Sequence, residues 1–81
     1  MELPNRSKLS KHWNLNPKTV FLNHGSYGAC PKAVLDYQHE LRSQLESDPV
    51  HFLDVTSKEL WSTAIETLSN FVNADKEGMT F

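Results

Sequence analysis

Residues 60–72, which read LWSTAIETLSNFV, carry the strongest structural pattern in the chain. Their apolar side chains recur every three or four residues, which is the period of one face of an α-helix. Just upstream, Thr56 and Glu59 have the spacing of a capping box, in which each side chain binds the backbone N–H of the other residue. We therefore expect a helix that begins at Thr56 and is broken by residues 73–78. Its apolar stripe consists of Leu60, Trp61, Ala64, Ile65, Leu68, Phe71 and Val72.

A second amphipathic helix is predicted over residues 31–47. Pro31 suits the first position of a helix, where its missing N–H costs nothing. The sequence Ser47-Asp48-Pro49 should end this helix, because the residue before a proline avoids helical angles. Residues 50–53, VHFL, are expected to form an ordered connector. The apolar face of the helix consists of Val34, Tyr37, Leu41 and Leu45.

The remaining elements are expected to be short. Ser7 could cap a helix over residues 8–13. Residues 19–22, TVFL, have the β-branched and aromatic composition of a buried strand. Residues 79–81, MTF, look like the opening of another strand, and for that reason we expect the chain to be truncated relative to a larger fold. The predicted fold class is a mainly α fragment with a short β segment.

Composition narrows the class of protein. The chain has 81 residues, a formal charge of −2 and 38% hydrophobic residues, which indicates one unit spanning residues 1–81. No basic face is available for nucleic acid, and no apolar run approaches the roughly 20 residues that cross a membrane. The single cysteine cannot form an internal disulfide. The cytoplasm is the default location.

The loop over residues 23–28, NHGSYG, is the main candidate for binding a ligand, and it holds two of the three glycines. We expect these glycines to supply unusual backbone angles. A loop that precedes a helix could present N–H groups to an anion, although a plain tight turn explains the same residues. His24 could reach a substrate or cofactor from this loop, or it could simply bond to local backbone.

Other candidate groups have simpler explanations. The histidines His12, His39 and His51 match no zinc spacing and are expected on the surface. Cys30 lies near a helix start, which favours a reactive thiolate, but no base is paired with it in the sequence. A metal site built from His24 and Cys30 would have an improbable spacing.

Residues 20–31, VFLNHGSYGACP, with the helix that follows and DPVHFL at 48–53, resemble the amino-terminal part of class V aminotransferase-fold enzymes. The isopenicillin N epimerase-like branch is the most similar. The resemblance runs from about residue 15 to residue 81, and its specific part is FLNHGSYG. It implies the α/β fold type I, pyridoxal 5'-phosphate as cofactor, a dimer, and an amino-acid substrate. Epimerases, aminotransferases, desulfurases and lyases all occur among these enzymes.

The resemblance also implies roles for particular residues. Asn23, His24, Gly25 and Ser26 would form a loop on the substrate side of the cofactor pocket. The phosphate-binding loop, the aspartate that faces the pyridine nitrogen and the Schiff-base lysine have no counterpart here. None of the lysines Lys18, Lys32, Lys58 and Lys76 matches the Schiff-base motif. We therefore expect the chain alone to hold no cofactor and to be inactive, with the remainder of the enzyme or a homodimer partner completing it.

A hypothesis from a different class is a small helical interaction module. In it the face of Leu60, Trp61, Ile65, Leu68 and Phe71 docks onto a partner helix or groove. This hypothesis predicts a cooperative melt of the isolated chain. The enzyme-fragment hypothesis predicts a poorly folded or aggregating chain, because its apolar stripe lacks the surface that should cover it.

Overall fold

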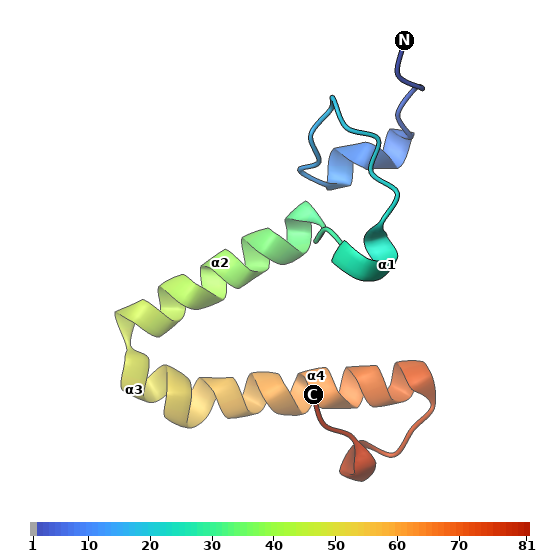
Figure 1. The fold of residues 1–81 in the computed structure, drawn as a ribbon. Coiled ribbons are helices and arrows are strands. Elements are labelled where there is room, and N and C mark those ends of the chain that lie inside the picture. The colour runs from blue at the N-terminus through green and yellow to red at the C-terminus, as the bar shows by residue number, and fades with distance from the viewer. Residues whose placement is uncertain (1) are drawn as a thin grey trace. The chain divides into compact units, whose positions relative to one another are not determined.

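The computed structural model describes residues 2–81, which are mainly helical (Figure 1). They divide into two compact units, with the boundary between Leu41 and Arg42. The order of elements is η1, α1, α2, α3, η2, α4 and η3. The prediction of a mainly α chain is therefore confirmed.

The first unit begins with the 3₁₀ helix η1, Lys8–His12. The Ser7 hydroxyl accepts a hydrogen bond from the Leu9 N–H at 3.2 Å, so the predicted short helix and its cap are confirmed. Trp13 ends the helix and forms an isolated antiparallel bridge with Pro31.

The predicted strand over residues 19–22 is wrong, because this segment is coil. Within residues 2–81 the bridge between Trp13 and Pro31 is the whole of the β pairing. A β-branched composition favours a strand only where a neighbouring strand satisfies its backbone groups. Residues 19–22 have no such neighbour.

Helix α2, Lys32–Ser47, agrees with the helix predicted over 31–47. Pro31 lies just before its first residue, and the Pro31 carbonyl accepts from the N–H groups of Val34 and Leu35, both at 3.1 Å. Pro31 therefore supplies the first carbonyl acceptor of the helix.

In the second unit, helical backbone runs from Pro49 to Val72. It consists of α3 (Pro49–His51), the π-helix η2 (Phe52–Thr56) and α4 (Ser57–Val72). The expected connector at 50–53 is therefore wrong. The helix begins at Asp48, whose carboxylate accepts from the His51 N–H at 3.3 Å. Aspartate at the N-cap followed by proline at the first position is a strong start signal, which explains why helix begins eight residues before Thr56.

The predicted capping box is wrong for the same reason. Thr56 already has helical angles, φ −60° and ψ −43°, and its side chain makes no cap hydrogen bond. The Ser57 N–H donates to the carbonyl of Phe52, five residues back, which is the wide turn of a π-helix.

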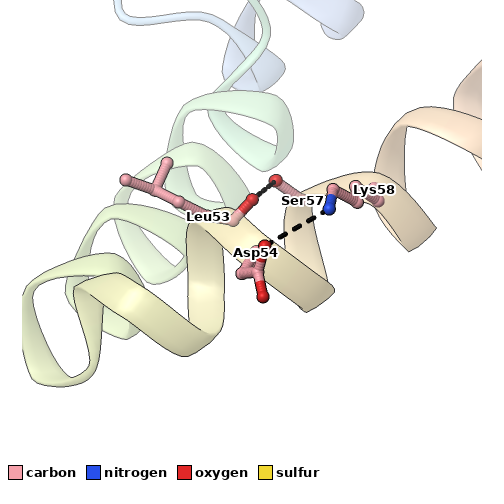
Figure 2. A network of polar contacts seen from close by, with 4 residues as sticks. All are labelled: Leu53, Asp54, Ser57 and Lys58. Carbon is pink, nitrogen blue, oxygen red and sulfur yellow. Dashed lines mark hydrogen bonds and ion pairs between the residues drawn. The ribbon is translucent and has the colours of Figure 1, made fainter.

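Polar contacts line this wide turn (Figure 2). The Ser57 hydroxyl donates to the Leu53 carbonyl at 2.8 Å, and Lys58 Nζ lies 3.3 Å from Asp54 Oδ1. The two charged side chains are 72% and 76% exposed, so water screens their attraction and the ion pair adds little stability.

Helix α4 ends as predicted. Asn73 has left-handed angles, φ 56° and ψ 47°, and the Ala74 N–H donates to the Ser69 carbonyl at 2.9 Å. The 3₁₀ helix η3, Lys76–Gly78, follows, capped by the Asp75 carboxylate. The strand expected at 79–81 is wrong, since these residues are coil.

The segment after η3 instead packs on α4. Ile65 is the buried apolar side chain of this unit, and Ser69 is buried beside it. The Ser69 hydroxyl donates to the Ile65 carbonyl at 2.7 Å and lies 3.2 Å from the Met79 sulfur. Phe81 meets Trp61 edge to face, with ring centroids 4.9 Å apart. The core of the second unit is therefore small and lies between one face of α4 and the residues that follow η3.

Candidate functional site

The loop that the sequence singled out contains one short helix, α1, His24–Tyr27. The Asn23 carbonyl accepts hydrogen bonds from the N–H groups of Ser26, at 3.3 Å, and Tyr27, at 3.0 Å. Asn23, His24, Gly25 and Ser26 thus lie together on a single turn, and all four are exposed. Their role on the substrate side stays a prediction.

The two glycines of the loop differ in how much space a side chain would have at each position. No glycine among residues 2–81 has a positive φ, so the expected unusual angles are wrong. Gly28 is constrained by space instead, because a Cβ there would lie 3.0 Å from the His24 carbonyl oxygen. A Cβ on Gly25 would meet nothing within 4 Å. Only Gly28 is therefore needed for this backbone path.

The His24 ring is held by contacts on two sides. Its Nδ1 accepts a hydrogen bond from the Ala29 N–H at 3.3 Å. The Phe21 ring meets it edge to face, with centroids 4.6 Å apart and an interplanar angle of 81°. The Trp13 ring lies farther away, at 6.4 Å. We call Trp13, Phe21, His24 and Ala29 the histidine cluster.

Trp13 ties this cluster to the N-terminal segment. Its indole N–H donates to the Ala29 carbonyl at 3.3 Å, a partly buried bond across 16 residues. Both backbone groups of Ala29 are therefore engaged, the N–H by His24 and the carbonyl by Trp13. These two hydrogen bonds close residues 13–29 into a loop, and His24 lies inside that loop sequence.

This geometry sets the chemistry that His24 can offer. Because Nδ1 accepts from a backbone N–H, the neutral ring carries its proton on Nε2. Nε2 has no hydrogen-bond partner among the described residues, so it is available as a donor. To act as a base through Nε2, the ring would have to change tautomer and lose the bond to Ala29. The arrangement suits binding of an oxygen acceptor, such as a carboxylate or carbonyl, better than proton abstraction.

Sequence reasoning missed three members of the cluster, namely Trp13, Phe21 and Ala29. Phe21 was assigned to a strand, and Ala29 acts through backbone groups that any residue possesses. Trp13 offered a signal, because it is a large amphipathic ring in a polar segment, and a buried indole N–H requires an acceptor.

Of the other candidate groups, His12 has a ring contact with a member of the histidine cluster. Cys30 is exposed and unpaired, and His12, His39 and His51 are exposed as expected. His12 contacts Trp13 edge to face at 6.4 Å. Within residues 2–81, no three side chains of His, Cys, Asp or Glu gather in a way that could hold a metal ion. None of the helices in that range combines the length and apolar character that crossing a bilayer requires.

Comparisons with protein-family models, with curated proteins and with solved structures find no match to this chain. The resemblance to class V aminotransferases therefore remains a prediction from the residues of the loop.

Proposed function

We propose that this chain is the amino-terminal segment of a pyridoxal phosphate-dependent enzyme of fold type I, similar to the isopenicillin N epimerase-like class V aminotransferases. The histidine cluster is the observation that carries the proposal. Residues 20–31 carry the resemblance, and they also supply three members of the cluster. A motif that builds a fixed and exposed histidine donor is typical of a binding loop.

In this proposal the Asn23–Ser26 turn faces the amino-acid substrate. His24 donates from Nε2 to an oxygen of the substrate, and the open space around Gly25 lets the substrate approach the backbone. The turn therefore binds and orients, and the chemical step belongs to residues outside this chain.

In this proposal the chain does not hold pyridoxal phosphate by itself. This cofactor requires a lysine for the imine, an anion site for the phosphate and a carboxylate beside the ring nitrogen. The contacts of His24 are two aromatic rings and a backbone N–H. Lys58 pairs with Asp54 on the exposed side of the π-helical turn. We therefore assign no catalytic residue and no cofactor-binding residue within this chain.

Exposed surface supports the need for a larger partner. The chain exposes 7251 Å². Two separate compact units of half its mass would together expose about 6,000 Å². The excess includes large apolar side chains in both units, such as Leu22 at 87% and Phe71 at 87% exposure. The remainder of the enzyme, or a homodimer partner, would cover this surface.

The first test is the coding DNA that follows the Phe81 codon, together with the intact mass of the native gene product. The proposal expects the same frame or an adjacent gene to encode a phosphate-binding loop and, further on, a Schiff-base lysine. Finding neither would contradict it.

The second test uses the complete enzyme. Replacing His24→Ala should raise KM for the amino-acid substrate about tenfold, because the N–H donor and its hydrogen bond to a charged group are lost. His51→Ala is the matched control, since His51 is also exposed but lies outside the histidine cluster. If the two substitutions changed KM equally, the proposal that His24 binds the substrate would be contradicted.

A third test addresses inactivity of the isolated chain. Pyridoxal phosphate mixed with the chain should give no imine absorbance that survives dialysis. A persistent band abolished by replacing one particular lysine would show that this chain holds the cofactor alone, which would refute that part of the proposal.

The helical interaction module remains a second candidate because Phe71 and Trp61 are exposed, at 87% and 50%. The face is already partly occupied, however. Ile65 is buried, and Phe81 packs against Trp61. A sharp, reversible thermal transition of the isolated chain would favour the module, whereas aggregation with exposed apolar surface would favour the enzyme segment.

A further inference from the structure

The first unit contains a hollow of about 340 Å³ beside the histidine cluster. It is lined by residues 3–7 and Ser10 on the N-terminal side, and by Leu15, Pro17 and residues 19–22 of the segment that leads to α1. Its walls include Leu3, Arg6, Leu15, Val20, Phe21 and Leu22. Phe21 belongs to both the hollow and the histidine cluster. The volume is in the range of small-molecule sites, which begins at about 300 Å³.

Arg6 is the one charged residue among those that line this hollow. Its Nη2 donates to the Leu15 carbonyl at 3.5 Å, the long limit of a hydrogen bond. No carboxylate pairs with Arg6 among the described residues. A guanidinium has five N–H donors in a planar fork, so most of them remain available to a ligand.

The rest of the lining is mostly apolar. Val20 is 49% exposed and Leu3 is 51% exposed, so both present apolar surface to water. A ligand that matches this lining has an apolar body, which displaces water, and one anionic group, which binds Arg6. A carboxylate suits the planar fork of arginine because two parallel hydrogen bonds can form.

We propose that this hollow binds small monocarboxylates with an apolar tail. The guanidinium of Arg6 holds the carboxylate, and the tail lies against Leu15, Val20 and Phe21. The proposal rests on the hollow and its charge, and it stands apart from the proposed role of His24.

Four probes separate the two components of binding. Octanoate has both the tail and the charge, acetate has only the charge, 1-octanol has only the tail, and octylammonium reverses the charge. Each is titrated into the ¹⁵N-labelled 81-residue chain, below any micelle-forming concentration, and followed by NMR. Octanoate should move the amide signals of Arg6, Leu15 and Val20, and each of the other probes should bind at least about tenfold more weakly.

Two variants test the charge. Arg6→Gln should weaken octanoate binding about tenfold, since a charge-assisted pair is lost. Lys8→Gln removes the same charge two residues away, outside the lining of the hollow, and should leave the Kd within about twofold. Both side chains are exposed, so neither substitution should disturb folding.

A third variant tests the apolar wall. Val20→Ser should weaken octanoate and leave acetate unchanged. Failure of octanoate to bind a wild-type chain whose amide signals are dispersed as in a folded protein would overturn the proposal. Equal affinities for octanoate and 1-octanol, or equal losses in Arg6→Gln and Lys8→Gln, would also overturn it, because the hollow would then not recognise a carboxylate through Arg6.

Discussion

The chain's two tryptophans show how differently its two units are held together. Trp13 donates its indole N–H to the Ala29 carbonyl across 16 residues, and this bond closes the loop that carries His24. Trp61 instead makes an edge-to-face contact with Phe81, on a helix whose backbone hydrogen bonds are local. The loop therefore depends on a few specific atoms, whereas α4 depends on helix propensity and a small apolar core.

This difference determines how each region responds to substitution. In α4 we expect a single side-chain change to weaken the small core and lower the stability of the unit without changing the backbone path of the helix. In the loop, one donor or one close backbone approach fixes the path of the chain. Because this loop depends on few contacts, we expect it to open more readily than α4.

The largest effect is expected in α4. Ile65→Ala should reduce the stability of the second unit by about 2–3 kcal/mol, because the one buried apolar side chain of that unit is lost. Amide hydrogen exchange along α4 and residues 79–81 measures this loss. Val50→Ala is the matched control on an exposed helical position, and it should have little effect. Comparable losses in both variants would mean that Ile65 does not anchor this unit.

The next effect distinguishes the two tryptophans. Trp13→Phe keeps a large aromatic ring but removes the donor to Ala29, and should destabilise the loop by about 1–2 kcal/mol. Faster amide exchange at Ala29 and changed shifts for His24 would report this. Trp61→Phe makes the same chemical change where the indole N–H has no hydrogen-bond partner among the described residues, and should cost less. If Trp61→Phe proved the more damaging, the assignment of a polar tie to Trp13 would be wrong.

Helix content was predictable because it depends on local pattern. The 3.6-residue stripe of α4 and the helix after Pro31 needed only side-chain spacing and standard end signals. The start at Asp48 was missed although Asp-Pro is a strong N-terminal signal, because the Thr56–Glu59 spacing pointed to a later start. The two strand predictions failed because a strand requires a partner that the segment itself cannot reveal.

The candidate site was predictable in part. His24 and its neighbours stand out as a polar group between glycines, and the structure places them on one turn. The contacts that hold this turn could not be predicted from residue spacing, since the hydrogen bond from Trp13 to the Ala29 backbone carbonyl joins residues 16 apart. The sequence also could not show why glycine is needed at position 28. A side chain there would crowd the His24 carbonyl, whereas the backbone angles of Gly28 are ordinary.

The glycine pair gives a smaller and sharper comparison within the loop. Gly28→Ala should cost about 1 kcal/mol, since the new methyl group would crowd the His24 carbonyl oxygen at 3.0 Å. Gly25→Ala should be neutral or stabilise by about 0.5 kcal/mol, because the site is open and alanine restricts the unfolded chain. Exchange of the Ala29 amide measures both. A larger cost at Gly25 than at Gly28 would contradict the path described for residues 23–29.

The smallest expected effect lies at the end of α4. Asn70 lies within the helix, whereas Asn73, three residues later, is the C-cap and has left-handed backbone angles. Asn73→Gly should stabilise the unit by up to about 0.5 kcal/mol, because glycine adopts the left-handed angles of this C-cap without steric cost. Asn70→Gly, inside the helix, should destabilise it by about 0.3–0.5 kcal/mol through lower helix propensity. Thermal melts followed by circular dichroism should separate the two variants in opposite directions. If both substitutions destabilised the helix equally, residue 73 would be a helical position, and the end of α4 would lie farther along the chain than Val72.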